Sequence, residues 1–292
     1  MSRFEYIESK TILSKLKDAP DPYFGITYNI NLYRGCQHGC IYCDSRSDVY
    51  RLEDLSRIRI KINSLSLLET ALKKRIKKGT IGTGSMNDPY MPVEKEEKLT
   101  REALKIIEKY KYPVHILTKS NLVERDTDII KEIGKEYSAV SFTITTPHDT
   151  LSKTIEPYAP VSTERLKALL KLSSNGIYSG VLLMPILPFI TDKRFDIEEL
   201  IKKCADNGAN YILFLPGMTL RKGQKEYYYS KLDENWPGLA DKYERKFKFQ
   251  YACHSDNHKQ LWDIFSNSCI KYNIAMKMNF YQQNLPTQQS LF

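Results

Sequence analysis

Three of the six cysteines fall within eight positions, in the stretch "YRGCQHGCIYCDSR" (residues 33–46), which we call the cysteine loop. The spacing C-x3-C-x2-C brings Cys36, Cys40 and Cys43 into one short segment. A structural zinc ion normally takes four protein ligands, so the loop is one ligand short unless His38 supplies the fourth. Alternatively, three thiolates hold three irons of a [4Fe-4S] cluster and leave the fourth iron open for a substrate or cofactor.

The composition is that of a globular chain. It has 292 residues, 41% of them hydrophobic, which is enough for one large α/β domain or two small ones. No apolar run approaches the roughly 20 residues that cross a membrane, and the first ten residues are too charged for a secretory signal. We therefore expect a cytoplasmic protein without a membrane partner. In that reducing compartment, clustered cysteines are expected to bind metal or carry out redox chemistry rather than form structural disulfides.

The formal net charge is +9. A positive charge of this size favours polyanionic partners, and nucleic acid is the leading candidate. Lysine-rich, solvated helix faces produce the same balance without such a partner, so charge alone does not decide between the two.

Short apolar runs alternate with longer amphipathic segments, as in repeated β-α units. The runs predict six strands, at residues 25–33, 79–84, 113–118, 139–145, 178–186 and 210–216. Helices are predicted between them, at about 63–78, 95–111, 126–137, 161–174 and 194–207. Six repeats without a change of composition predict one parallel sheet. We expect an α/β fold, a partial (β/α)6 TIM-type barrel with a helical C-terminal extension.

The composition changes near residue 218 to segments rich in Tyr, Lys and Trp. We therefore expect a barrel over residues 1–217, an extension packed on it over 218–282, and a flexible tail over 283–292. The cysteine loop would directly follow the first strand, at the carboxyl end where β-α barrels hold their active sites. Gly35 and Gly39 are expected to let this loop wrap closely round a cluster.

The cysteine loop resembles the signature of the radical S-adenosylmethionine (radical SAM) superfamily. In that signature C-x3-C-x2-C follows the first strand of a six-unit β-α barrel, and an aromatic residue, here Tyr42, precedes the last cysteine. The likeness extends to the branch related to spore photoproduct lyase, and it covers roughly residues 25–215. Four later segments carry it: "MNDPYMPVEKEEKLTREAL" (86–104), "HILTKSNLVERDTDII" (115–130), "SFTITT" (141–146) and "GVLLMPILPFITD" (180–192).

The resemblance implies two cofactors, a [4Fe-4S] cluster and S-adenosylmethionine (SAM). Cys36, Cys40 and Cys43 would bind three irons, and the methionyl amine and carboxylate of SAM would chelate the fourth. One electron from the cluster, supplied by a reductant such as flavodoxin or ferredoxin, would cleave SAM to methionine and a 5′-deoxyadenosyl radical. That radical would abstract hydrogen from the substrate, while the protein positions the cofactor and excludes water.

The resemblance also assigns cofactor contacts to single positions. Lys119, at the end of the third strand, would pair with the SAM carboxylate, although a solvated loop lysine is the alternative. Asn87 and Thr145 align with polar cofactor contacts, but polar groups at strand ends also simply cap a sheet. Met184 ends the fifth strand, where an adenine could stack or the core could enclose it. Tyr42 joins these cofactor-binding positions through its place beside the last cysteine.

Two positions depart from the lyase pattern. The lyase has a hydrogen-donating cysteine where this chain has Ser85, and a tyrosine after the third cluster cysteine where this chain has Asp44. A serine O-H bond is too strong to donate a hydrogen atom readily to a carbon radical. The resemblance therefore implies the cofactor chemistry but not the repair of spore photoproduct. Asp44 is a candidate catalytic residue, as a substrate ligand or an acid/base, unless it forms a salt bridge with neighbouring Arg46.

The remaining reactive side chains are assigned structural roles. Asp88, followed by Pro89, is expected to form a turn, and Glu94 to lie in the first turn of a helix. The segment "YACHSDNHK" (251–259) is interpreted as a loop and a helix start rather than a zinc site. Buried structural thiols are expected at Cys204, Cys253 and Cys269.

The last residues, "PTQQSLF", contain a Q-x-x-L-F pattern. It resembles the short peptide by which many bacterial DNA-repair and replication proteins dock on the β sliding clamp. Gln288, Leu291 and Phe292 would be the anchors, and a tail that packs on its own domain is the alternative.

Together these observations predict a radical SAM enzyme that acts on nucleic acid, in DNA repair or base modification. A radical SAM enzyme that modifies RNA or protein is the first alternative. The second is a non-catalytic, zinc-binding protein associated with nucleic acid.

Overall fold

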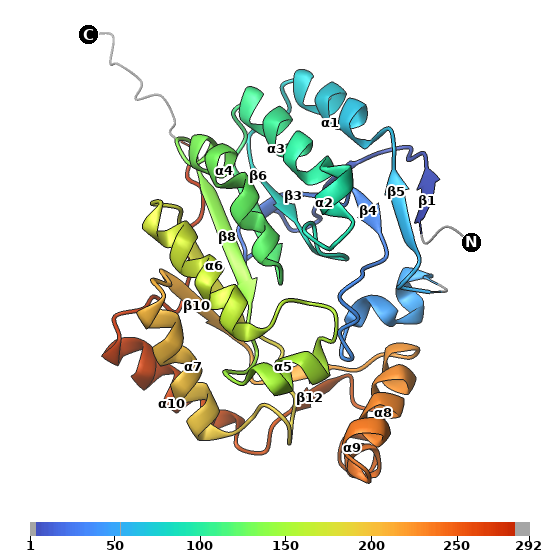
Figure 1. Ribbon diagram of the computed structural model, residues 1–292, viewed down its shortest axis with the longest axis vertical. Coiled ribbons are helices and arrows are strands. Elements are labelled where there is room, and N and C mark those ends of the chain that lie inside the picture. Colours follow the sequence, from blue (N-terminus) through green and yellow to red (C-terminus); the bar gives the residue numbers. More distant parts are fainter. Residues whose placement is uncertain (1–3, 53, 284–292) are drawn as a thin grey trace.

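The computed structural model describes residues 4–52 and 54–283 of the chain. Its largest sheet has seven strands in the order β10-β9-β8-β7-β6-β3-β2. Their bounds are β2 (Leu13–Lys15), β3 (Ile26–Ile30), β6 (Thr80–Thr83), β7 (Val114–Thr118), β8 (Ser138–Thr143), β9 (Ser179–Leu183) and β10 (Tyr211–Phe214). Neighbours from β3 to β10 pair in parallel, and β2 pairs antiparallel with β3. The six parallel strands match the six predicted ones (Figure 1).

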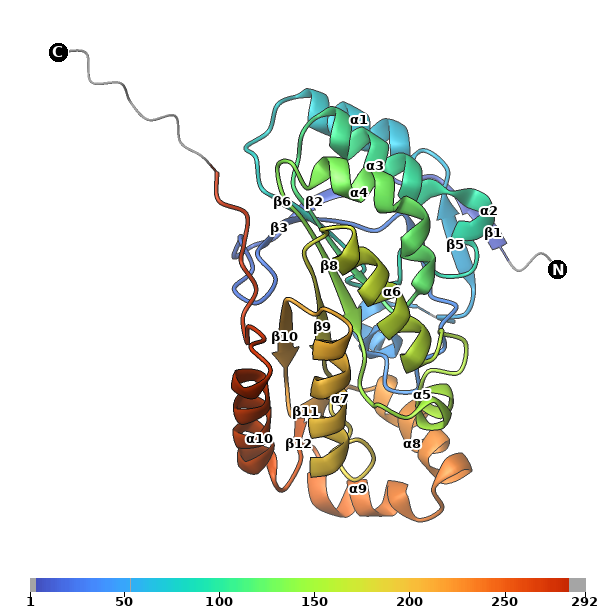
Figure 2. The same cartoon turned by 60° about the vertical axis from the view of Figure 1, so that its left-hand side comes forward.

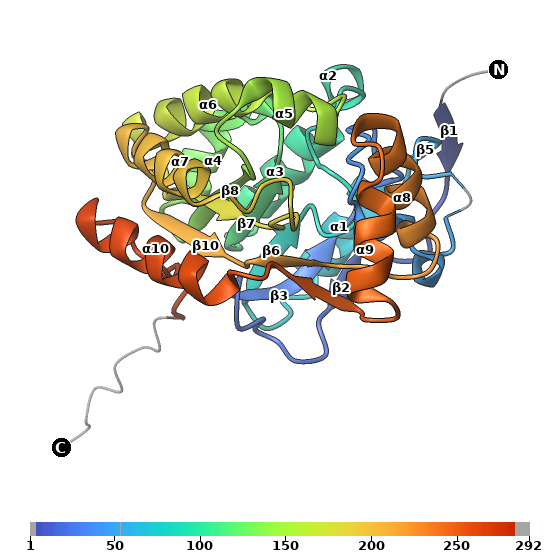
Figure 3. The same cartoon turned by 90° about the horizontal axis from the view of Figure 1, so that it is seen from below.

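Helices follow these strands and cover the outer face of the sheet (Figure 3). They are α1 (Ser64–Lys73), α2 (Glu94–Glu97), α3 (Leu99–Lys109), α4 (Thr127–Ile133), α5 (Asp149–Ile155), α6 (Ser162–Ser174) and α7 (Arg194–Asp206). Every residue of β8 and β9 is buried, because both faces of the sheet are covered there. None of the described helices is both long enough and apolar enough to cross a membrane.

The helix predicted at 95–111 is interrupted. Lys98 adopts a left-handed backbone conformation (φ 54°), which ends α2 and starts α3 in a new direction. In α3 the residues Thr100, Ala103, Leu104 and Ile107 are buried, which is the spacing of one helix face. The interruption places Glu94 in a separate short helix whose role is described below.

The predicted first strand, 25–33, is too long. The main-sheet strand β3 ends at Ile30, and β4 (Tyr33–Arg34) instead pairs with β5 (Ile58–Lys61) in a second sheet. The third strand of that sheet is β1 (Phe4–Ile7). Cys36 therefore follows β4 and not the main-sheet strand, since Tyr33 pairs with Ile60 of β5 and both residues are buried.

From residue 217 to 283 the structure has a two-stranded sheet and three helices. The sheet pairs β11 (Gly217–Thr219) antiparallel with β12 (Ala252–His254), and the helices are α8 (Gln224–Asn235), α9 (Leu239–Phe247) and α10 (His258–Lys271). Helix α10 packs beside α7, while α8 lies against the cysteine loop (Figure 2). Segment 251–259 thus contains the expected loop and helix start, preceded by the short strand β12, which was not predicted. Cys204, Cys253 and Cys269 are all fully buried, as expected.

The inner face of the sheet carries a buried polar chain. His115 Nε2 lies 2.8 Å from Ser141 Oγ, which in turn lies 2.7 Å from the Tyr211 hydroxyl. His115 Nδ1 faces the Phe24 carbonyl oxygen at 3.1 Å. Burial lowers the pKa of His115 to about 4, so this imidazole is neutral in the folded protein near pH 7.

We expect this histidine to make the fold acid-sensitive. Because the folded pKa of about 4 lies below the usual value of 6.5, the stabilisation is complete above pH 6.5 and is lost as the pH falls toward 4. A shift of this size corresponds to about 3 kcal/mol of unfolding free energy. Denaturant unfolding of His115→Gln should show a shallower loss between pH 6.5 and 4 than wild type. A matched change at exposed His254 should leave the wild-type slope; equal slopes for wild type and His115→Gln would contradict the prediction.

Candidate active site

A cavity of about 340 Å3 opens at the carboxyl ends of the parallel strands. Its walls come from the cysteine loop and from residues that follow β6, β7, β9 and β10. Cys36, Cys40 and Cys43 all line it. The site therefore lies at the predicted edge of the sheet, even though β4 rather than β3 leads into the loop.

The cysteine loop is attached to the protein through its backbone. Cys36 N donates a hydrogen bond to Leu55 O (2.8 Å), and Ile41 N donates one to Ile155 O (2.9 Å). Cys40 is buried, whereas Cys36 and Cys43 are partly exposed to the cavity. The thiols are thus presented by a segment that is held at both ends.

Neighbouring segments leave no room for a side chain at the two glycines of the loop. Gly35 has φ +90°, and a Cβ there would lie 2.6 Å from Arg57 O. Gly39 has φ +69°, and a Cβ there would lie 2.7 Å from the Tyr158 ring. The expected backbone freedom is present, but it serves the packing of the loop on the protein.

The donor set fits a cluster better than a single metal ion. Burial raises the pKa of Cys36 to about 12 and also raises that of Cys40, so metal binding must displace protons from these thiols. In the described part of the chain, no three His, Cys, Asp or Glu side chains are grouped round one ion position. A [4Fe-4S] cluster does not need such a group, because each thiolate binds a different iron.

His38 lines the same cavity as the three cysteines. Its Nε2 lies 3.1 Å from Asp88 Oδ2, and both side chains are buried. Nδ1 has no hydrogen-bond partner in the described part of the chain. One ring nitrogen thus faces a carboxylate, while the suggestion of a fourth zinc ligand at His38 stays a prediction.

Asp88 braces three segments of the cavity wall. It accepts hydrogen bonds from Tyr90 N (2.9 Å), Thr118 Oγ1 (2.7 Å) and Lys119 N (2.6 Å). Burial alone would raise the pKa of Asp88, but His38 and these donors lower it to about 2. The expected turn is present, and the same carboxylate also fixes the backbone of Lys119 and faces the cysteine loop.

Lys119 lines the cavity, as the resemblance implied. Its Nζ lies 5.7 Å from the centre of the Tyr42 ring. Burial by itself would lower the pKa of Lys119, but the neighbouring Cys40 and Glu156 outweigh it and raise the pKa above its usual value. The ammonium is therefore held charged inside the cavity.

Two buried charged residues behind this wall were missed in the sequence. Glu156 is 1% exposed and pairs with Arg165, which is 0% exposed, at 2.6 Å. Glu156 Oε1 also accepts a hydrogen bond from the Tyr42 hydroxyl. One signal could have found them: Arg165 occupies an apolar-face position of α6, between Ser162 and Leu169, where a charge needs a buried partner.

The other predicted cofactor positions divide into two groups. Asn87, Met184 and Tyr42 line the cavity, and Asn87 Nδ2 donates to Tyr33 O (2.7 Å). Thr145 is buried but lies outside the cavity lining, and Thr143, the last residue of β8, lines it instead. The strand ends two residues earlier than predicted, which moves the lining hydroxyl to Thr143.

Asp44 lies at the cavity rim among residues from distant segments. It accepts a hydrogen bond from the Tyr50 hydroxyl (3.0 Å) and faces Arg221 Nε at 3.5 Å. The suggested salt bridge with Arg46 is wrong, because the Arg46 guanidinium stacks 3.7 Å from the centre of the Tyr227 ring. Asp44 thus lies at the rim beside Tyr50 and Arg221, and its role as a catalytic residue stays a prediction.

Ser85 also lines the cavity, and its hydroxyl accepts a hydrogen bond from Asn29 Nδ2 (2.8 Å). Across the described ranges, the cavity lining contains no cysteine besides the three of the loop. No further thiol is therefore placed to return hydrogen to a substrate radical.

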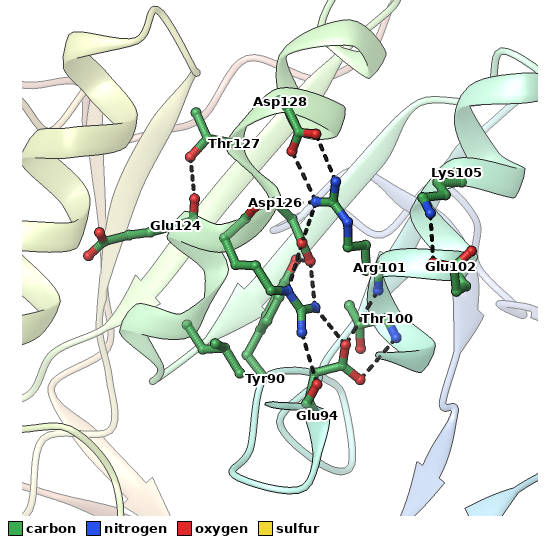
Figure 4. Close-up of polar contacts among 12 residues, drawn as sticks. Tyr90, Glu94, Thr100, Arg101, Glu102, Lys105, Glu124, Asp126, Thr127 and Asp128 are labelled. Carbon is green, nitrogen blue, oxygen red and sulfur yellow. Dashed lines mark hydrogen bonds and ion pairs between the residues drawn. The ribbon is translucent and has the colours of Figure 1, made fainter. Parts of the chain in front are cut away.

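A charged network supports the segment that follows β6 (Figure 4). Glu94 is fully buried and accepts hydrogen bonds from Thr100 N (3.0 Å) and Arg125 Nη2 (2.7 Å). Arg101 bridges Asp126 and Asp128, each at 2.8 Å. Glu94 is thus the structural first-turn residue that was expected.

The segment after residue 217 also contacts the cysteine loop directly. Gln224 is 1% exposed, and its Nε2 donates to Tyr42 O and to Thr219 O, each at 2.9 Å. One side-chain amide therefore joins the loop to the β11 wall of the cavity.

The tail anchors Gln288, Leu291 and Phe292 lie outside the described residues, so clamp docking stays a prediction.

Comparisons with known proteins agree with this geometry. The family model described as the radical SAM superfamily matches residues 30–204. An uncharacterized protein of Methanocaldococcus jannaschii is 32% identical over 274 residues, which cover 93% of this chain and 96% of that protein. A protein of Pseudomonas phage M6, named radical SAM Nα-GlyT isomerase, is 21% identical over 178 residues, 61% of this chain and 36% of that protein.

Solved structures of spore photoproduct lyase variants share the fold. One has a TM-score of 0.68 at 20% identity and covers 92% of this chain and 79% of the other. Another, with bound AdoMet and dinucleoside spore photoproduct, has a TM-score of 0.66 at 17% identity and covers 91% and 78%. At these identities the match shows the fold alone.

Proposed function

The chain belongs to the radical SAM superfamily and is a radical SAM enzyme, and from this premise we propose that it acts on nucleic acid, in DNA repair or base modification. The family implies SAM, an iron-sulfur cluster and a reductant. We propose that the cluster is of the [4Fe-4S] type and that the reductant is a flavodoxin or ferredoxin. The observation that carries the assignment is the single cavity in which three cysteines and Lys119 meet.

The chain's own residues would divide the work within that cavity. Cys36, Cys40 and Cys43 would hold three irons, and the Lys119 ammonium would bind the carboxylate of SAM. Bound together, the two cofactors would supply a carbon-centred radical that abstracts hydrogen from the substrate. Tyr42 and Met184 would exclude water from this reaction, since both present apolar surface to the cavity.

The rim favours nucleic acid as the substrate. A volume of about 340 Å3 is at the small end for ligand pockets, so a cofactor would occupy much of it and a larger substrate would approach from the opening. Next to the rim residue Asp44, the Arg221 guanidinium lies 5.0 Å from the centre of the Tyr251 ring. Phe249, two positions before Tyr251 in the chain, is 99% exposed. Such side chains bind phosphates and stack on bases. The net charge of +9 agrees with a polyanionic substrate.

The reaction is proposed to differ from spore photoproduct repair. The two sources of returned hydrogen expected in the lyase are replaced by Ser85 and Asp44. Asp44, held by Tyr50 and Arg221, is proposed to contact the substrate at the rim.

We also propose that the sheet curves as a partial (β/α)6 barrel over residues 1–217, and that 218–282 form its extension. The six unpaired cysteines fit the proposed cytoplasmic location.

The function can be tested by following hydrogen transfer. The protein would be reconstituted with iron and sulfide under anaerobic conditions, reduced with dithionite and given SAM together with DNA or RNA purified from cells grown in heavy water. Deuterium in the 5′-deoxyadenosine product, measured by mass spectrometry, is expected with DNA. Transfer from RNA alone would replace the DNA proposal by the RNA alternative, and transfer from neither would exclude nucleic acid as the substrate.

A further inference from the structure

Three charged side chains meet behind the cysteine loop, and only two of them form an ion pair. Glu156 and Arg165 pair at 2.6 Å and are both almost completely buried. Within the described part of the chain, the ammonium of Lys119 has no hydrogen-bond or ion-pair partner and faces the Tyr42 ring. Glu156 therefore forms an ion pair with Arg165 and not with Lys119, although both cations lie near this carboxylate.

Both oxygens of Glu156 are occupied by residues other than Lys119. Oε1 accepts the hydrogen bond of the Tyr42 hydroxyl, and Oε2 faces Arg165. The guanidinium is itself fixed, because Nε donates to Pro160 O (2.7 Å) and Nη1 donates to Thr143 O (2.8 Å). A planar guanidinium suits this position, since it offers separate donors to three acceptors at once.

Two of the anionic side chains behind the cavity wall already have partners other than Lys119. Glu156 and Arg165 cancel, and Asp88 is satisfied by His38 and three hydrogen-bond donors. Among the described residues, Lys119 is left without an ion-pair or hydrogen-bond partner at the cavity wall, although Glu156 and Asp88 attract it from a distance. Lys119 and Glu156 both contact the Tyr42 side chain: Lys119 Nζ lies 5.7 Å from the centre of the ring, and Glu156 Oε1 accepts the hydrogen bond of its hydroxyl. In agreement with this proximity, Lys119 helps Arg165 to lower the pKa of Glu156 against the effect of burial.

We propose that Arg165 is a positioning residue that occupies Glu156 and thereby leaves Lys119 free to bind the carboxylate of SAM. Without the guanidinium, Glu156 would be a buried carboxylate whose nearest cation is Lys119, and the two would pair. An anionic ligand would then have to compete with an internal carboxylate for the same ammonium. The inference rests on the proposed function, because SAM is the anion that Lys119 would bind.

The test measures binding of radiolabelled SAM to the reconstituted protein by equilibrium dialysis. Arg165→Met should weaken binding by about tenfold or more, since an opposite charge at this range stabilises a buried ionic group by that order. The double variant Glu156→Gln with Arg165→Met removes the competing carboxylate as well and should return the Kd to within about threefold of wild type. Arg165→Lys keeps the charge and should bind better than Arg165→Met. The EPR spectrum of the reduced cluster should change on adding SAM in wild type and in the double variant.

The possible outcomes separate the two ideas. If wild type does not bind SAM, the proposed function fails and the inference falls with it. If wild type binds but the single and double variants are weakened equally, Arg165 has only a structural role, while the proposed function stands. If Arg165→Met does not fold, Glu156→Gln decides alone, because glutamine keeps an acceptor for Tyr42. Equal or tighter SAM binding by that variant supports the inference, and weaker binding overturns it.

Discussion

Replacing Cys40 with alanine is expected to abolish binding of the iron-sulfur cluster. Cys40 is the buried member of the three cysteines, and two remaining thiols cannot hold three irons of a cubane. The reconstituted wild type should contain about four irons per chain, and Cys40→Ala close to none. The brown colour and the reductive cleavage of SAM should disappear together. Iron analysis after gel filtration, with 5′-deoxyadenosine measured by chromatography, checks both expectations.

The matched control is Cys269→Ala, which removes a fully buried thiol from α10. This variant should keep its iron content, because Cys269 lies outside the cavity lining. Iron retained at the wild-type level by Cys40→Ala would refute the assignment of this residue as a ligand. A loss of iron from both variants would instead point to a general failure to fold.

Replacing Lys119 with methionine is expected to weaken SAM binding by roughly 10- to 100-fold, because a charge-assisted hydrogen bond contributes about 1.5–3 kcal/mol. The iron content should not change, since Lys119 holds no iron. The ammonium makes no hydrogen bond or ion pair with the described residues, and its neighbours Cys40 and Glu156 offset the cost of burying it. Removing it breaks no such bond, so the metal-free variant is expected to unfold at close to the wild-type denaturant concentration.

Equilibrium dialysis with SAM and denaturant unfolding measure these two effects separately. Lys153→Met is the control, because this exposed lysine of α5 lies away from the cavity. SAM affinity that is unchanged in Lys119→Met would show that the ammonium does not hold the cofactor. A loss of both stability and affinity would assign Lys119 a structural role.

The strands, most of the helices and the three-thiol donor set follow from local sequence patterns. The alternation of apolar runs and amphipathic segments predicts six parallel strands, because each strand and helix follows from the periodicity of its own residues. The spacing of Cys36, Cys40 and Cys43 likewise defines a three-thiol donor set within one loop, and Lys119 at a strand end lines the cavity. The helix break at Lys98 and the second sheet formed by β1, β5 and β4 were beyond such local patterns.

Only the tertiary structure decided which partners these residues have. Tyr42 and Glu156 are 114 positions apart, and Gln224 reaches Tyr42 O from 182 positions away. His38 Nε2 faces Asp88, 50 positions later in the chain, and Asp44 faces Arg221 rather than Arg46. Such pairings depend on how distant elements pack, which periodicity within a single segment does not encode. The sequence by itself indicated the kind of chemistry, because the cysteine loop and four later segments together resemble one superfamily, whereas the charge balance around Lys119 required the folded chain.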